Sequence, residues 1–329
     1  MKTLLLSLCA LTLTSCSLWR SPPSPTPNEV KVGTWNLEFY GADPKFRRDT
    51  PPRDDADQER IAERIRALGV AVLAVQEICG AAPLDDLARR IGPTWRPVLG
   101  TTGKWTDGRT QQAVGFLYDS AALILVHAEE LLDFPSEIDG LNVFHRKPVT
   151  ACFRHRGSGM DFRLVTVHLK AGRKARDLAK RRAEADTLHA WIRKLQADDR
   201  EDQDIVILGD FNSTYGAEPA ELLAREGAMA LLAQSTPTPT ILWFDDPIDQ
   251  FAVGRGFDEV VRGSLVAHAV TGEAARLAFR KSCSDHFPCT MVLRGARDDD
   301  PTATFAKGPA AQVLPVSRRA AGATASPRS

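Results

Sequence analysis

Carboxylate, imidazole and amide side chains recur at or just beyond the ends of apolar, strand-like runs of this sequence. They are Asn36, Glu77, His168, Asp210, Asn212, Asp249, Asp285 and His286. Burying a carboxylate at a strand end is costly unless a cation or a hydrogen-bond donor meets it, so these placements require partners. If the strand ends share one rim, the set contains what metal-assisted hydrolysis needs: hard oxygen ligands, two histidines and amide donors.

Each of these motifs taken alone has an ordinary structural explanation. The segment Gly209–Asn212 is compatible with a strand-to-turn junction, His168 with a satisfied core histidine, and Ser284–His286 with a cap or turn. Their order along one chain, each attached to a strand-like run, favours a functional site over all of these explanations together.

Strand-like stretches outnumber helical ones in the body of the chain. The expected strands are Val30–Leu37, Val70–Ile78, Ala113–Tyr118, Leu123–Val126, Pro148–Phe153, Phe162–Leu169, Asp204–Leu208, Ile248–Val253 and Cys289–Leu293. Helical spacing appears at Ile61, Ile65 and Leu68, closed by Gly69, and again at Leu178, Leu188, Trp191, Ile192 and Leu195. The pattern predicts an α/β (α+β) domain in which two packed sheets carry helices on their outer faces.

In this order, Asn36, Gln76-Glu77, His168, Gly209–Asn212, Asp249 and Ser284–His286 resemble the motifs of the endonuclease/exonuclease/phosphatase superfamily, the deoxyribonuclease I-like fold. The resemblance spans residues 30–294. It implies a four-layered sandwich of two mixed β-sheets packed face to face. It also implies cleavage of phosphate esters with Mg²⁺, or with Mn²⁺ or Ca²⁺ in its place.

The resemblance implies roles for the matching positions. Glu77 and Asn36 would hold the metal, with Asp285 or Asp210 helping. His286, oriented by Asp249, would act as general base toward water or as a donor to the phosphate, and Asp210 is the alternative base. In the same way, Asn212 would donate to a non-bridging phosphate oxygen, and His168 would stabilise the phosphate or protonate the leaving oxygen.

Two positions depart from the family pattern. Where many relatives have an acid to orient the histidine that matches His168, the pair Gln111-Gln112 offers only an amide. Asp249 is followed by Gln and Phe, without the His or Arg often found there. The first departure weakens the case for His168 as a strong acid, whereas the second leaves the orienting carboxylate in place.

The substrate expected from the sequence is nucleic acid, DNA or RNA. Between Lys170 and Arg182 there are seven basic residues and one acid, starting directly after His168. Arg146-Lys147-Pro148 resembles the segment that gives pancreatic-type deoxyribonucleases an arginine for the phosphate backbone. Arg146 and Lys170 are therefore the expected substrate-binding residues. A solvated helix face is the alternative explanation of the basic run. Trp105 could stack on a base or sugar, or simply pack.

Two other functions are compatible with the same motifs. The superfamily includes phosphodiesterases and phosphatases of lipid head groups and inositol phosphates, but the Pro-Ser-Trp-Cys-Asp-Arg run of the inositol phosphatases and a long apolar hairpin are missing. A binding lipoprotein without turnover is the second alternative. The presence of the central acids and both histidines argues against it.

The two ends of the chain predict export and anchoring. Residues 1–15 have a lysine, a short apolar run and a Leu-Thr-Ser-Cys ending that resembles a lipobox, so Cys16 would be acylated. An ordinary secretory peptide is the alternative. Residues 16–28 form a Pro-rich tether, 29–296 the catalytic domain and 297–329 a disordered tail. We expect a monomeric lipoprotein, membrane-anchored in the periplasm or at the cell surface.

Charge and cysteine content add two constraints. The chain has 42 Lys and Arg against 42 Asp and Glu, and residues 29–296 have a net charge of −4, so nucleic acid is not bound by global attraction. The four cysteines of the domain, Cys79, Cys152, Cys283 and Cys289, allow three full pairings. Cys283 and Cys289 could form a local clip, whereas Cys79 and Cys152 could equally stay unpaired in the core.

Overall fold

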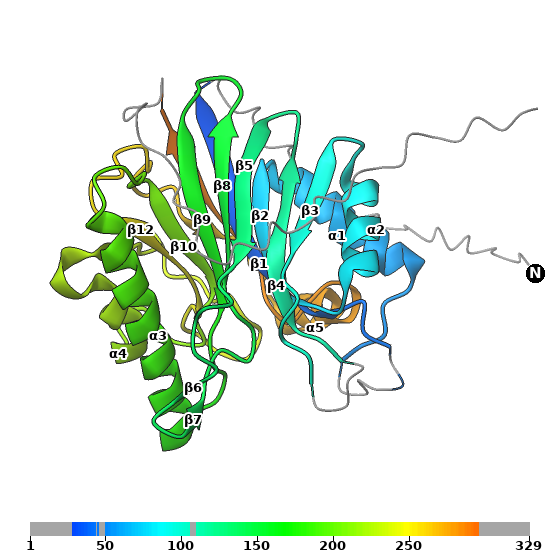
Figure 1. Cartoon of the computed structure of the whole chain (residues 1–329). Coiled ribbons are helices and arrows are strands. Elements are labelled where there is room, and N and C mark those ends of the chain that lie inside the picture. Colours follow the sequence, from blue (N-terminus) through cyan, green and yellow to red (C-terminus); the bar gives the residue numbers. More distant parts are fainter. Residues whose placement is uncertain (1–27, 44, 46–49, 106–109, 296–329) are drawn as a thin grey trace, which may run out of the picture.

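Two six-stranded β-sheets pack face to face in the computed structural model, which describes residues 28–43, 45, 50–105 and 110–295 (Figure 1). The first sheet runs β13 (Val266–Ala267), β14 (Cys289–Arg294), β1 (Glu29–Tyr40), β2 (Val72–Ile78), β4 (Ala113–Asp119) and β3 (Trp95–Leu99). The second runs β11 (Met229–Leu231), β12 (Asp249–Gly254), β10 (Ile205–Asp210), β9 (Asp161–His168), β8 (Val149–His155) and β5 (Leu123–Glu130). A small hairpin is formed by β6 (Glu137–Ile138) and β7 (Leu141–Asn142).

Helices cover the outer face of each sheet, which makes four layers (Figure 1). They are α1 (Asp55–Leu68), α2 (Ala81–Ile91), α3 (Ala175–Gln196), α4 (Glu218–Glu221) and α5 (Glu273–Ser282), with a 3₁₀ helix at Leu222–Gly227. α1, α2 and α5 pack on the first sheet, and α3 packs on the second. The predicted four-layered sandwich of two mixed sheets is confirmed.

Three apolar clusters hold these layers together. The central cluster fills the space between the sheets with side chains from both, among them Phe116 and Phe153. In the two outer clusters, Ile61 of α1 packs against the outer face of the first sheet and Ile192 of α3 against that of the second. Every predicted strand contributes to one of them, because alternate strand residues point to opposite faces of a sheet.

α1 ends at Gly69, as its sequence predicts, and begins at a capping box that the sequence analysis did not identify. The side chain of Asp54 accepts from the backbone N–H of Asp57 at 2.9 Å, and Gly69 closes the helix at φ 66°. For α3, the predicted apolar face is only partly buried. Leu188, Ile192 and Leu195 are buried, but Leu178 is exposed, because it lies in the first turn of a helix that reaches the sheet further along.

The ends of the chain fall outside the described residues. The predicted signal peptide, Cys16, the tether and the tail belong to residues 1–27 and 296–329 or border them. Among the described residues, no helix has both the length and the apolar character needed to cross a membrane.

Candidate active site

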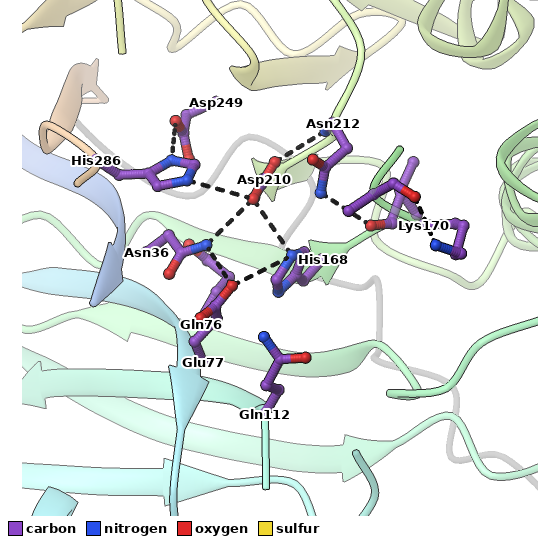
Figure 2. A network of polar contacts seen from close by, with 12 residues as sticks. Asn36, Gln76, Glu77, Gln112, His168, Lys170, Asp210, Asn212, Asp249 and His286 are labelled. Atoms are coloured by element: carbon purple, nitrogen blue, oxygen red, sulfur yellow. Dashed lines mark hydrogen bonds and ion pairs between the residues drawn. The ribbon is translucent and has the colours of Figure 1, made fainter. Parts of the chain in front are cut away.

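Chemistry-bearing side chains from both sheets meet at one edge of the sandwich (Figure 2). β1 and β2 are parallel, as are β9 and β10, so the carboxyl ends of these strands lie at that edge. β14 is antiparallel to β1 and β12 to β10, so the amino ends of these two strands reach the same edge. The strand pairing brings together seven of the eight predicted residues: Asn36, Glu77, His168, Asp210, Asn212, Asp249 and His286.

A buried amide fixes the two sheets relative to each other beneath this edge. Gln76 of β2 donates to Thr34 on β1 at 3.0 Å and to Thr166 on β9, in the other sheet, at 3.1 Å. All three side chains are fully buried. A hydrogen bond between sheets costs little to form when every polar group in it is satisfied, and it restricts sliding of one sheet over the other.

Asp210 is the centre of the polar network. Its Oδ1 accepts from the backbone N–H of Asn212 at 2.8 Å. Its Oδ2 accepts from Asn36 Nδ2 at 3.1 Å and lies 3.3 Å from His168 Nε2 and 3.8 Å from His286 Nε2. Burial, reinforced by the nearby charge of Asp249, raises the pKa of Asp210 to about 7 against the pull of His286.

The chain approaches Asp210 through a glycine that no other residue can replace. Gly209 has φ 140°, and a Cβ there would lie 2.1 Å from the carbonyl oxygen of Val167 on β9. The close approach of β10 to β9 puts Asp210 directly opposite His168 in the sheet register.

His286 and Asp249 form a buried pair. His286 Nδ1 lies 2.8 Å from Asp249 Oδ2, and the backbone N–H of His286 donates to Ser284 Oγ at 3.0 Å. Burial alone would lower the pKa of His286, but the ion pair and hydrogen bond with Asp249, helped by Asp210, reverse this effect and hold it well above its ordinary value. The ring is therefore fixed in orientation, with Nε2 directed toward Asp210.

Glu77 is held at the edge by strained backbone. Glu38, Phe39 and Glu77 all have positive φ, at 45°, 51° and 61°, which side chains other than glycine adopt at a cost. The turn aims the N–H of Phe39 at Glu77 Oε2, 3.1 Å away, and Asn36 Nδ2 donates to Glu77 Oε1 at 3.2 Å. Strain kept at this position is typical of a functional site.

Asn36 directs its amide nitrogen at the neighbouring carboxylates, and the metal-ligand role that the resemblance implied stays a prediction. A cation would bind its amide oxygen, but Oδ1 accepts from the N–H of Glu38 at 3.0 Å, which turns the amide nitrogen toward Glu77 and Asp210. Asn36 is thus a donor that holds two carboxylates together.

A second acid, which the sequence analysis missed, supports the strained turn. Glu38 is buried and accepts from Arg53 Nη2 at 3.0 Å and Arg280 Nη2 at 2.8 Å. Burial and the charge of Asp285 raise the pKa of Glu38 to about 7, against the two arginines. Asp285 is half-buried and acts electrostatically on this group and on His286. Among the described residues, the group whose ligand atoms lie close enough together to hold one metal ion does not include Asp285.

His168 is buried and lacks the partner that would make it an acid. Nδ1 has no hydrogen-bond partner among the described residues. Neither predicted amide reaches it: Gln112 accepts from Arg146 Nη1 at 2.9 Å, and Gln111 donates to Thr101 and Thr102. Burial, together with the charge of Arg146, holds the pKa of His168 well below its ordinary value. The ring is therefore neutral at pH 7.

The two residues expected to bind substrate differ in their surroundings. Arg146 is buried, and its Nε donates to the carbonyl oxygen of His168 at 2.9 Å. With its other nitrogens on Gln112 and Leu169, it supports the site, and it also lines the cleft beside His168, so its contact with a phosphate stays a prediction. Lys170 is partly exposed beside the site, 3.2 Å from Asp177.

Asn212 lies at the rim with the amide turned inward. It has φ 49°, and its Nδ2 donates to the carbonyl oxygen of Leu169 at 3.0 Å. One of its two N–H groups is engaged in this way, which leaves the second to act on a ligand.

The site suits a divalent cation. Asp210, Asp249 and His286 offer ligand atoms that all lie within 4.8 Å of one another, and Asp249 Oδ1 is buried with no hydrogen-bond partner among the described residues. In the same part of the chain, no Lys or Arg forms an ion pair with Glu77, Asp210 or Asp249. Carboxylate oxygens that no Lys or Arg neutralises are the ligands that Mg²⁺ prefers.

The four cysteines are all free thiols in this structure. Cys152, Cys283 and Cys289 are buried, and Cys79 is partly buried. The clip between Cys283 and Cys289 is therefore not formed.

The sequence of the domain matches a known protein family. Residues 33–286 match the model of the Endonuclease/Exonuclease/phosphatase family. The protein belongs to this family. The matched range contains every residue of the polar network, from Asn36 to His286. Members of the family hydrolyse phosphodiesters and phosphate monoesters, so the chain is a hydrolase of phosphate esters by family.

Solved structures of the family have the same fold at low sequence identity. A mannosyl-6-phosphatase of Bacteroides thetaiotaomicron is 16% identical, with TM-score 0.59, and the alignment covers 80% of this chain and 99% of that one. The catalytic domain of human Nocturnin, solved with a sulfate anion, is 15% identical, with TM-score 0.57, and the alignment covers 82% of this chain and 95% of that one. TDP2 of D. rerio, in complex with single-strand DNA product, is 13% identical, with TM-score 0.55, and covers 81% and 99%. The sequence matches no curated protein.

Proposed function

We propose that this family member is a divalent-metal-dependent phosphodiesterase that cleaves nucleic acid. The observation that carries the proposal is the buried pair His286–Asp249, facing Asp210 beside Glu77. It combines a proton-holding imidazole with two further carboxylates, Glu77 and Asp210, that form no ion pair with a Lys or Arg of the described residues. Such a set is suited to in-line attack of water on a phosphate ester.

Glu77, with Asp285 or Asp210 as the second carboxylate, would hold the ion. When bound, the ion supplies neutralisation of phosphoryl charge and a lower pKa for bound water. Glu77 and Asp210 fit a hard cation because both accept from Asn36 Nδ2, at 3.2 and 3.1 Å, and neither forms an ion pair with a lysine or arginine of the described residues.

Different residues of the chain donate and accept protons in the proposed reaction. His286 carries its proton on Nε2 at neutral pH, because Asp249 stabilises the imidazolium, so we assign it as the donor to the phosphate. Asp210, 3.8 Å away, is the group that accepts a proton from water. Neutral His168 and the free N–H of Asn212 donate to phosphoryl oxygens, where negative charge develops.

Basic residues beside the site favour nucleic acid as the substrate. Lys170 and Lys180 line the cleft next to Glu77 and His168, and Lys174 and Arg182 are exposed close to them in the chain. The TDP2 structure with single-strand DNA product is a fold relative that acts on this class of substrate. Local positive charge on an acidic body suits the recognition of a few phosphates.

The test is a panel of phosphate esters with the purified protein. We expect hydrolysis of DNA or RNA with Mg²⁺ or Mn²⁺, loss of activity with EDTA, and a rate reduced at least ~10²-fold in His286→Ala and Asp210→Asn. Asp246→Asn, an exposed acid outside the network, is the matched control. Release of phosphate from mannose 6-phosphate or of phosphocholine from lipid, with nucleic acid untouched, would contradict the proposal.

The location of the enzyme is part of the same proposal. A lipid anchor at Cys16 would place the domain outside the inner membrane as a monomer on a Pro-rich tether. Metabolic labelling with a fatty-acid analogue tests the anchor. We expect incorporation into the natural chain and none into Cys16→Ala.

A further inference from the structure

A cleft of about 790 Å³ opens beside the catalytic network. Glu77 and His168 line its catalytic end, and Lys170 and Lys180 line another part of the wall. The same lining includes aromatic rings: Phe39, Trp105, Phe144 and His145. The cleft therefore has more space than a phosphate needs, and its extra wall is aromatic.

Trp105 is the exposed ring of this wall. Its side chain is 40% exposed, so part of the ring is accessible to a ligand in the cleft. Its centroid lies 6.1 Å from Phe39, at an interplanar angle of 58°, and 6.3 Å from His145, nearly edge-on at 88°. The ring is supported by its neighbours on two sides.

Hydrogen bonds set the orientation of the indole. Trp105 Nε1 donates to Gln112 Oε1 at 3.2 Å, and the same oxygen accepts from buried Arg146 at 2.9 Å. Arg146 in turn donates to the carbonyl oxygen of His168. One chain of contacts thus connects the aromatic wall with the catalytic histidine.

The segment that leads to Trp105 is anchored before any ligand arrives. The buried carboxylate of Glu130 accepts from the N–H and hydroxyl of Thr101 at 2.7 Å each, and from those of Thr102 at 3.0 and 2.5 Å. The N–H of Gly103 also donates to the carbonyl oxygen of His145 at 3.0 Å. A pre-organised aromatic side chain loses little conformational entropy when it binds, which is an advantage for recognition.

We propose that this wall is a base-stacking subsite, in which Trp105 stacks on the nucleobase next to the phosphate held at Glu77 and His168. Lys170 and Lys180 then meet the neighbouring phosphate. The inference rests on the proposed function and narrows it to single-stranded nucleic acid, because a base inside a duplex hides its face in the stack. The two lysines in the lining favour a substrate with several phosphates over a lipid, whose acyl chain would need an apolar wall.

Calorimetry with two small probes tests the subsite in the full chain with Mg²⁺. AMP and ribose 5-phosphate have the same phosphate and sugar, but only AMP has a base. We expect AMP to bind at least about tenfold more tightly, since stacking on an aromatic side chain is sequence-tolerant and strong. Trp105→Ala should make the two affinities equal by weakening the binding of AMP alone. Trp105→Phe should keep most of the difference in affinity.

Trp243→Ala is the matched control, because Trp243 is also exposed, at 52%, and is not in the lining of the cleft. It should leave the AMP ratio unchanged. Equal affinities of the wild-type protein for the two probes would overturn the subsite, and so would an equal loss for both probes in a folded Trp105→Phe variant.

Cleavage assays separate this inference from the proposed function. We expect single-stranded DNA or RNA to be cut at least about tenfold faster than duplex, and Trp105→Ala to reduce that preference. Cleavage of both forms at equal rates would overturn the subsite and leave the nuclease proposal intact. A base-dependent affinity without hydrolysis of any diester would overturn the nuclease proposal and leave the subsite intact.

Discussion

Nδ1 of His286 lies 2.8 Å from Oδ2 of Asp249, although 37 residues separate them in the chain. Asp249 begins β12 in one sheet and His286 lies shortly before β14 (Cys289–Arg294) in the other, so the pair exists only because the two sheets pack face to face. The same ring presents Nε2 to Asp210, 3.8 Å away. The orientation of one imidazole therefore depends on both sheets.

Asp249→Asn should lower kcat at least ~10²-fold and change KM little, because the imidazolium of His286 loses its charge partner and its fixed tautomer. Initial rates on bis-p-nitrophenyl phosphate measure both constants. Asp246→Asn, an exposed acid shortly before Asp249, should keep the wild-type values. A kcat within threefold of wild type in Asp249→Asn would show that His286 needs no orienting acid.

Glu77→Gln should abolish stabilisation by Mg²⁺. An ion that binds only the folded protein raises its free energy of unfolding by RT ln(1 + [L]/Kd), so the melting temperature of the wild-type protein should rise with Mg²⁺. Glu63→Gln, an exposed acid on α1, is the control and should respond as the wild type does. The same rise in Glu77→Gln would place the ion elsewhere.

Arg146→Met should lower the free energy of unfolding by about 3 kcal/mol, because the buried carbonyl of His168 and the amide of Gln112 lose a donor. Urea denaturation measures this loss. We expect the salt dependence of DNA affinity to stay as in the wild type, since the guanidinium of Arg146 is already engaged by His168, Gln112 and Leu169. A smaller salt slope with unchanged stability would support the phosphate-binding role. Lys174→Met, an exposed residue, should not affect stability.

Lowering the pH from 7 to 5 should destabilise the protein through His268. Burial, with the charge of Lys31, lowers the pKa of His268 to about 4 in the folded state, against about 6.5 in the unfolded chain. Between these values the unfolded state binds the extra proton. Stability is therefore complete above about pH 6.5 and falls as the pH drops toward 4.

The size of this effect is about 2 kcal/mol at pH 5 for this one residue. Urea denaturation at pH 7 and pH 5 measures it in the wild type and in His268→Gln, which does not titrate. The variant should lose less stability between the two pH values. The same loss in both proteins would show that other groups account for the pH dependence.

Local patterns were sufficient for the strands and for the chemistry of their ends. Apolar, β-branched runs predict strands because those side chains pack on a pleated sheet, and each of the nine predicted strands is present. α2 was missed although Leu84, Leu87, Ala88 and Ile91 have helical spacing, and β3 was missed because Pro97 lies within it.

Residue types and order were enough to indicate an edge of acids, histidines and amides, because burying such groups demands partners whatever the fold. Which partner each group meets depends on contacts between residues far apart in the chain. Only the packing of helices and sheets turned Arg146 inward, left His168 Nδ1 without a partner among the described residues, and joined Glu38 to Arg280 across 242 positions. Burial and the direction of a side chain are properties of the packed layers, and no local pattern contains them.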